Sequence, residues 1–345
     1  MAFPEITGLR DFWARQTGRV PAATMTQADR VLLCLLGIGI EQGLMQLQRE
    51  RPEFEAFCDW IKGEAGLPDP VEVARYHAWL EDAPVPPEAQ ARLDALAQMP
   101  DVLDGADLAH WQQHGYVVLR AAISRAEADA AADVLWRHIA ASPENPDSWY
   151  NPAAKGLWIP LYHAPELAVA RQSLRVRKAF AQLYGRPDLW MLTDRTSFNP
   201  PERHGTGYQV FQLHWDTSLT PPIPLAMQGI LYLTDTAADQ GALRVVPGFH
   251  SRIEAWLAGL GDADPRAVDL DGEAVPIPAS AGDLIIWRQD LPHGASPNRA
   301  GKPRLAQYLT MIDGAAEDER EWRSCRVRAR PASGRSAATP PPVRN

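Results

Sequence analysis

Cysteine is scarce in this sequence. Its 345 residues include three cysteines, Cys34, Cys58 and Cys325, an odd number at scattered positions. Such usage fits a reducing compartment and argues against a disulfide scaffold or a cysteine-rich zinc site. We therefore expect a cytoplasmic protein.

Long apolar runs are also missing. The first residues have neither the basic region nor the continuous apolar region of a signal peptide. The most apolar run, residues 31–45, is interrupted by Glu41 and Gln42. It is shorter than the roughly 20 apolar residues that span a bilayer. We interpret it as a buried helix and expect no membrane partner, although an oligomer interface, as in a homodimer, or a carrier-protein dock stays open.

An excess of positive charge is absent too. The formal net charge is −9 at pH 7, and such a surface repels nucleic acid, which we do not expect as a partner. The sequence has no glycine-rich phosphate loop, no GxSxG elbow and no HExxH helix. Hydrophobic residues make up 46% of the chain, enough for one large domain with an appendage or for two ordinary domains.

The first hundred residues have helical patterns. Thr26 is a suitable N-cap for a helix ending near residue 48, and three further helices are predicted at 52–62, 70–81 and 86–98, each beginning near a proline. This stretch contains no motif of known chemistry. We predict a helical N-terminal extension over residues 1–105.

Beyond this extension, strands come to dominate. Helices are predicted at 107–113, at 125–140 with Ser124 and Glu127 forming a capping box, and at 171–184 with Gly185 as the stop. Short segments rich in branched and aromatic residues predict strands at 189–193, 208–214, 226–233, 242–246, 283–287 and 305–312. The fold class is therefore mainly β with helices (α+β), an antiparallel sandwich or jelly roll over residues 106–325. We expect residues 326–345 to form a disordered tail.

One short motif points to a metal. In His214-Trp215-Asp216, side chains two residues apart on a strand point to the same face, so His214 and Asp216 can converge. Two histidines and one carboxylate form the facial triad of non-haem iron(II) oxygenases. His293, which follows a predicted strand by a short turn, is a suitable third ligand. The alternative is a chance pair with an ordinary core histidine.

Arginine side chains suggest where a dicarboxylate would lie. Arg304 begins the last predicted strand, eleven residues after His293, and its guanidinium matches a carboxylate in a bidentate fork. Arg299 is its nearest competitor but falls in a turn. Arg195 is a second candidate anchor for substrate or cosubstrate, with a buried structural ion pair as the alternative.

These elements together resemble the phytanoyl-CoA dioxygenase family of iron(II)- and 2-oxoglutarate-dependent oxygenases. The resemblance covers roughly residues 107–312, and its motifs occur in the family's order. They are the WQQHGYVVL segment at 111–119, His214 to Asp216, the GALRVVPGFH segment at 241–250, Gly282-Asp283, His293-Gly294 and Arg304.

This resemblance implies a double-stranded β-helix core and a set of roles. His214, Asp216 and His293 would bind iron(II), and Arg304 would hold the distal carboxylate of 2-oxoglutarate. The family often has a hydroxyl residue two positions after the distal histidine, where this chain has Ala295. One cosubstrate hydrogen bond must then come from elsewhere or be absent, and four residues are candidates for it: Thr193, Gln212, Gln228 and Tyr232.

The function expected from the resemblance is hydroxylation of a small-molecule substrate. Dioxygen and 2-oxoglutarate would be consumed, and succinate and carbon dioxide released. The same cofactor chemistry could instead end in desaturation, epoxidation or ring closure, and a non-oxidative cupin-like isomerase or binding protein is the alternative from another class. The stretch 149–163, rich in aromatic residues such as Trp149 and Trp158, either lines the substrate cavity or plugs the barrel end.

Overall fold

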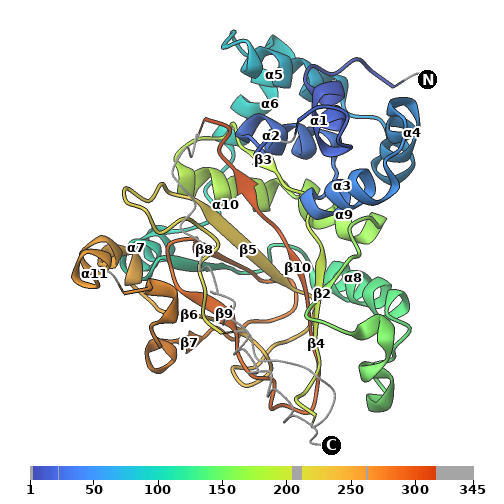
Figure 1. The fold of residues 1–345 in the computed structure, drawn as a ribbon. Coiled ribbons are helices and arrows are strands. Elements are labelled where there is room, and N and C mark those ends of the chain that lie inside the picture. Colours follow the sequence, from blue (N-terminus) through green and yellow to red (C-terminus); the bar gives the residue numbers. More distant parts are fainter. Residues whose placement is uncertain (1–2, 22, 204–211, 262, 316–345) are drawn as a thin grey trace, which may run out of the picture.

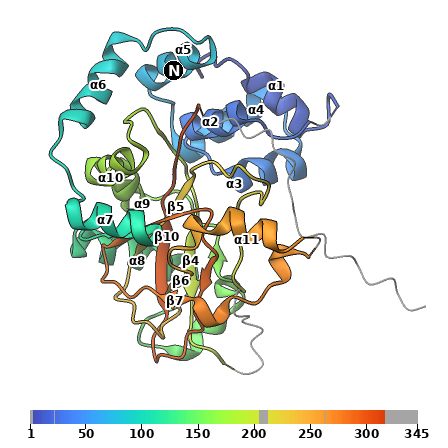
Figure 2. The same cartoon turned by 90° about the vertical axis from the view of Figure 1, so that its left-hand side faces the viewer.

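The computed structural model describes residues 3–21, 23–203, 212–261 and 263–315. A block of N-terminal helices lies against one end of a β-sheet core (Figure 1). The view at right angles places a layer of helices on one side of the larger sheet and a smaller sheet on the other (Figure 2).

The N-terminal block is helical, as predicted. Its elements are α1 Leu9–Gln16, α2 Gln27–Leu36, α3 Ile40–Met45, the single π-helical turn η1 Gln46–Glu50, α4 Phe54–Ala65, α5 Pro70–Leu80 and α6 Pro87–Gln98. Thr26 caps α2 in a capping box with Asp29, and Asp69 caps α5. Helix α1 is an element that the sequence analysis missed.

The prediction of a single long helix between residues 26 and 48 is wrong. Helix α2 ends at Gly37, whose φ of 66° is a left-handed conformation that glycine adopts without strain. After Ile38 and Gly39 the chain begins α3 in a new direction. A Cβ on Gly39 would lie 2.7 Å from the Tyr162 ring, so this glycine also allows close approach to the β-sheet core.

The apolar run itself lies in the core, as expected. Val31, Leu32, Leu33 and Leu36 are all at most 2% exposed. No single helix in the described part of the chain combines the length and the apolar character that crossing a bilayer demands.

Trp190 links the helical block to the rest of the chain. This side chain belongs to the same apolar cluster as the N-terminal helices. The Arg75 guanidinium of α5 lies 3.8 Å from the Trp190 ring centroid and donates a hydrogen bond of 3.0 Å to the carbonyl of Leu189. The extension therefore shares a core with the β-domain along this seam.

The β-domain is a double-stranded β-helix, which confirms the expected fold. Its six-stranded sheet has the order β1-β8-β5-β10-β4-β2, its three-stranded sheet the order β7-β6-β9, and β3 pairs with β11. The strands are β1 Tyr116–Leu119, β2 Trp158–Ile159, β3 Trp190–Met191, β4 Thr196–Asn199, β5 Met227–Tyr232, β6 Leu243–Val245, β7 Val275–Pro276, β8 Leu284–Arg288, β9 His293–Ala295, β10 Arg304–Tyr308 and β11 Met311–Ile312.

The two faces of the large sheet have different partners. Outward residues such as Leu231 and Ile286 pack in one cluster with the covering helices, whereas Tyr232 and Trp287 point inward to a second cluster. The covering helices are α7 Gly105–His114, α8 Arg125–His138, α9 Pro165–Gln172 and α10 Leu174–Tyr184, and α11 Ile253–Gly259 follows β6. The inward face, between the two sheets, is where a ligand site can form.

Most local predictions in this domain are confirmed. Ser124 and Glu127 form the predicted capping box, and Gly185 ends α10 with a φ of 72°. The helix expected at 171–184 is two helices, because α9 ends at Ser173, which also caps α10. The strand expected at 208–214 falls mostly outside the described residues.

One histidine makes the seam between extension and β-domain sensitive to pH. His163 Nε2 lies 3.0 Å from the Gln42 side-chain oxygen of α3, and burial, with a contribution from Arg171, lowers the pKa of His163 to about 4. The unfolded chain binds a proton near pH 6.5, so stability is full above that pH and falls as the pH drops toward 4.

We expect the free energy of unfolding to decrease by about 2 kcal/mol over this interval from His163 alone. Urea denaturation at pH 7 and pH 4.5 measures it. The His163→Asn variant should lose less stability than wild type on acidification, and the exposed His138→Asn variant should behave as wild type. Equal losses in all three proteins would contradict this role.

Candidate active site

Two histidines face each other between the sheets. The backbone N–H of His214 donates to the carbonyl of His293 at 2.9 Å, and the N–H of His293 donates back at 3.0 Å. In an antiparallel ladder, residues paired in this way lie directly opposite, with side chains on one face. Accordingly, the ring centroids are 4.6 Å apart, although 79 positions separate the residues in sequence order.

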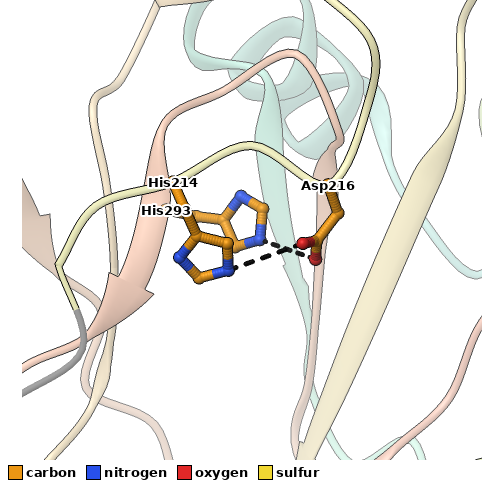
Figure 3. Close-up of side chains that lie close together, drawn as sticks. All are labelled: His214, Asp216 and His293. Carbon is orange, nitrogen blue, oxygen red and sulfur yellow. Dashed lines mark ion pairs between the residues drawn. The ribbon is translucent and has the colours of Figure 1, made fainter. Parts of the chain in front are cut away.

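Asp216 completes the cluster. Its Oδ1 lies 3.6 Å from His214 Nε2, and its Oδ2 lies 3.4 Å from His293 Nε2 (Figure 3). One ligand atom from each residue lies within 4.8 Å of the others. Neighbouring ligands of an ion with bonds of about 2.1 Å are about 3 Å apart, so a small contraction would let all three bind one ion.

Backbone carbonyls orient both imidazoles. His214 Nδ1 lies 3.1 Å from the carbonyl oxygen of Gln212, and His293 Nδ1 lies 3.0 Å from that of Leu291. With an ion bound, donation from each Nδ1 would leave Nε2 as the ligand atom on the side of Asp216. Gln212 therefore contributes through its backbone, while the residue itself is exposed.

The charge states suit a divalent cation. Burial, reinforced by the neighbouring His293, lowers the pKa of His214, so the imidazole is neutral near pH 7. Burial opposes ionisation of Asp216, but its hydrogen bond to His293 and the two imidazoles outweigh that effect and hold the pKa well below its usual range. The cluster thus offers two imidazole nitrogens and a carboxylate.

Arg304 lies on the same inner face at the start of β10. The residue is 1% exposed, and its terminal nitrogen donates a 2.7 Å hydrogen bond to Ser197 Oγ of β4. Its Nε is buried and has no hydrogen-bond partner among the described residues, and no carboxylate there forms an ion pair with it. A buried guanidinium is stabilised by a paired anion, so this position suits one.

The sequence that surrounds this cluster identifies the family to which the chain belongs. The profile of the family described as phytanoyl-CoA dioxygenase (PhyH) matches residues 111–306, more than half of the chain. The chain belongs to the phytanoyl-CoA dioxygenase family. This confirms the resemblance drawn from the sequence.

Individual relatives of this family are distant. A protein of Dictyostelium discoideum that bears the name phytanoyl-CoA dioxygenase is 22% identical over 257 residues, or 59% of this chain and 73% of that protein. A dioxygenase of Aspergillus fumigatus is 28% identical over 198 residues, 55% of this chain and 60% of that one. The match therefore spans less than two thirds of the Aspergillus protein.

Solved structures are also similar. The non-haem α-ketoglutarate-dependent carbocyclase SnoK from nogalamycin biosynthesis is 18% identical, with a TM-score of 0.44 over 63% of this chain and 85% of that chain. A likeness of this size says nothing about the reaction of this family member.

Iron(II) and 2-oxoglutarate are the cofactor and cosubstrate of the phytanoyl-CoA dioxygenase family, and the residues present fit both. The cluster of His214, Asp216 and His293 has the donor set of a facial triad. The unmatched guanidinium of Arg304 fits the distal carboxylate of a dicarboxylate. Arg299 is a poorer anchor, because its side chain is 74% exposed and lies 3.9 Å from Glu202.

Two candidates for a further cosubstrate hydrogen bond do not fit this geometry. The Tyr232 hydroxyl donates its hydrogen to the carbonyl of Ile277 at 3.1 Å and accepts the N–H of Leu243 at 2.8 Å, so it has no hydrogen left to donate. Thr193 lies three positions before β4, against the helical extension, where its carbonyl oxygen would be 3.1 Å from a Cβ on Gly39. Ser197, which the sequence analysis did not name, contacts Arg304 instead.

The aromatic stretch at 149–163 was expected either to line the substrate cavity or to plug the barrel end, and its residues differ in this respect. Trp149 is 4% exposed and packs in the helix-covered core, as a plug would. Trp158, at 42% exposed, lies on β2, where its Nε1 donates a 3.3 Å hydrogen bond to the Tyr308 hydroxyl. The indole of Trp158 therefore adjoins the inner face of β10, as a cavity wall would.

Gln228 is the remaining candidate, and it contacts the carboxylate. Its Nε2 donates a 2.8 Å hydrogen bond to Asp216 Oδ2, and its Oε1 is buried with no partner in the part of the chain that the structure describes. Outer residues of this kind orient metal ligands. In this family member Gln228 aims the carboxylate at the site between the two imidazoles.

We expect Gln228→Leu to weaken iron(II) binding by about 10-fold, because Asp216 loses the donor that fixes its orientation. Anaerobic iron(II) titration measures the change, and Gln90→Leu on the exposed face of α6 is the control. Unchanged affinity in Gln228→Leu would show that Asp216 is oriented without this bond.

Proposed function

We propose that this protein hydroxylates a small organic molecule, with iron(II) bound by His214, Asp216 and His293 and with 2-oxoglutarate held by Arg304. The observation that supports it most is the Arg304 guanidinium, which is buried on the same inner face as the triad and has no counter-ion among the described residues. A cupin-like isomerase or binding protein has no need of such a dicarboxylate anchor.

The bound cofactor and cosubstrate supply a balanced oxidation, in which substrate C–H, dioxygen and 2-oxoglutarate give substrate C–OH, succinate and carbon dioxide. The protein's own residues hold the reactants for this step. His214, Asp216 and His293 would hold the iron, which would bind cosubstrate and dioxygen. Arg304 and Ser197 fix the far end of 2-oxoglutarate, and the buried walls of the β-helix exclude water.

The experiment is an aerobic incubation with iron(II), ascorbate, 2-oxoglutarate and a panel of small molecules. We expect succinate formation that depends on one class of substrate, and incorporation of labelled dioxygen into the product as a hydroxyl group. Absence of succinate above background across the panel would count against the oxygenase. Succinate without a labelled hydroxyl would instead indicate desaturation or ring closure.

The substrate would lie at the end of the inner face opposite Arg304. Phe198 packs outward against Trp136, so the alternate residues Ser197 and Arg195 face the interior. Arg195 lies 5.3 Å from the Trp158 ring centroid and pairs with Glu41 of α3 at 2.5 Å. The ion pair expected as an alternative for Arg195 is present, although it is partly exposed and not buried, and it joins the helical extension to the β-domain.

We expect Arg195→Ala to raise the substrate KM about 10-fold and leave the 2-oxoglutarate KM within twofold, because it removes both the cation–π contact and the pairing that hold this wall. Steady-state succinate formation with each reactant varied measures the two constants. Arg299→Ala is the matched surface control. A rise confined to the 2-oxoglutarate KM would place Arg195 at the cosubstrate instead.

A further inference from the structure

A second cavity lies at the seam between the helical extension and the β-domain. Its volume is about 720 Å³, within the range of small-molecule sites. One wall comes from α2, α5 and α6, and the other from α10 and the β3 region, elements that adjoin each other above the sheets in Figures 1 and 2. None of the residues of the triad and neither Arg304 nor Ser197 lines it.

Most of this cavity's wall is apolar. The side chains that form it include Leu36, Leu93, Leu96, Met99, Leu189 and Met191. Leu174, the first residue of α10, also lines it and is 57% exposed, an unusual exposure for a leucine in the described part of the chain. Apolar walls with one exposed leucine favour a ligand with an apolar body.

Four of the charged side chains in the wall neutralise one another. Arg75 pairs with Glu72 at 2.8 Å, and Arg92 pairs with Asp69 at 2.5 Å. Cys34 also lines the cavity, and burial raises the pKa of its thiol to about 12, so it adds no negative charge.

Arg177 is the one charged side chain among the described wall residues that has no ion-pair partner among them. It lies on α10 and lines the cavity, and its guanidinium has neither a hydrogen bond nor an ion pair with any residue that the structure describes. The residue is half-buried, and burial lowers the pKa of its guanidinium, while the nearby Glu72 raises it and Arg75 lowers it further. A half-buried guanidinium in an apolar wall, with no hydrogen bond or ion pair among the described residues, attracts an anion from solution.

We propose that this cavity binds a small amphipathic carboxylate, with its carboxylate on Arg177 and its apolar body along Leu93, Leu96 and Leu174. A monoanion matches the single unpaired guanidinium, whereas a phosphate would bring a second charge into largely apolar surroundings. This site is separate from the metal cluster and does not depend on the proposed oxidation.

The position of the cavity gives the ligand a structural effect. One wall of the cavity belongs to the extension and the other to the β-domain. A ligand that contacts both walls therefore stabilises the contact between the extension and the β-domain. Binding to the folded state alone raises the melting temperature as ligand concentration increases. A thermal readout therefore reports on this site even when no oxidation takes place.

The test is calorimetric titration of the iron-loaded full-length protein with decanoate, with decanol as the uncharged counterpart. We expect saturable decanoate binding, a rise in melting temperature, and at least tenfold weaker binding of decanol. Arg177→Gln should weaken decanoate binding at least tenfold. Arg175→Gln, which removes an equal charge from the same helix outside the cavity, should not.

Two further variants distinguish binding in this cavity from binding at the metal cluster. Ala95→Phe, which fills the cavity from α6, should weaken decanoate binding while leaving iron content unchanged. His214→Ala should bind decanoate as wild type does. Binding lost in His214→Ala but retained in Arg177→Gln would place decanoate at the metal site and overturn the proposal, as would no saturable binding or equal binding of decanol.

Discussion

An Asp216→Ala variant is expected to lose iron binding and turnover together. Asp216 is the only anion in the cluster, and each of its oxygens lies within 3.6 Å of one imidazole Nε2. Its removal leaves two imidazole nitrogens, which carry no negative charge to balance a divalent cation. Since loss of a supporting residue alone costs 10- to 100-fold in metal affinity, loss of this ligand should cost more than about 100-fold.

Anaerobic iron(II) titration and succinate formation measure the two effects. His214→Ala should behave similarly, and Asp239→Ala, on an exposed loop after β5, should match wild type. Circular dichroism checks that the variants remain folded. A folded Asp216→Ala protein that retains stoichiometric iron and normal turnover would refute the ligand assignment.

Replacement of Arg304 should weaken the binding of 2-oxoglutarate. The 2-oxoglutarate KM of Arg304→Gln is expected to rise about 100-fold, with the substrate KM within about threefold, because a charge-assisted bidentate contact is lost from a buried site. Ser197→Ala removes only the hydroxyl that accepts from Arg304, so its effect should be about 10-fold or less.

Two comparisons make this prediction specific. Arg304→Lys keeps the charge but loses the planar fork, so its 2-oxoglutarate KM should lie between those of wild type and Arg304→Gln. Arg299→Ala, at the exposed competitor, should change nothing. Unchanged cosubstrate dependence in Arg304→Gln, with a rise in Arg299→Ala or Arg195→Ala, would move the anchor to one of those residues.

The metal cluster could be proposed from sequence because part of it is local. His214 and Asp216 share a face by the period of an extended chain, and the family motifs supply His293 and Arg304. The direct pairing of His214 with His293 could not be derived, since it depends on the register of two segments far apart in the chain. The contact of Ser197 with Arg304 depends in the same way on the pairing of β4 with β10.

Side-chain hydrogen bonds were harder to anticipate than strand positions. Gln228 was one of four equal candidates, and only the structure shows its amide on Asp216. Tyr232 was another, but both of its hydrogen bonds are used within the core. A sequence shows which groups can donate, whereas tertiary packing decides which of them are already occupied.

The extension shows a similar limit. Its helices follow from caps and prolines, but the turn at Gly37 and Gly39 depends on tertiary contact, where Gly39 lies against Tyr162 of the β-domain. The same turn orients α3 so that Glu41 reaches Arg195. The helical extension thus contacts Arg195 of the β-domain, a contact that its sequence alone did not indicate.

An anaerobic crystal structure with iron(II) and 2-oxoglutarate, with anomalous data collected at the iron edge, tests the central claim most directly. We expect one anomalous peak about 2.1 Å from His214 Nε2, His293 Nε2 and an Asp216 oxygen, with the distal carboxylate of 2-oxoglutarate on Arg304. Iron bound at another place, or 2-oxoglutarate bound away from Arg304, would contradict it.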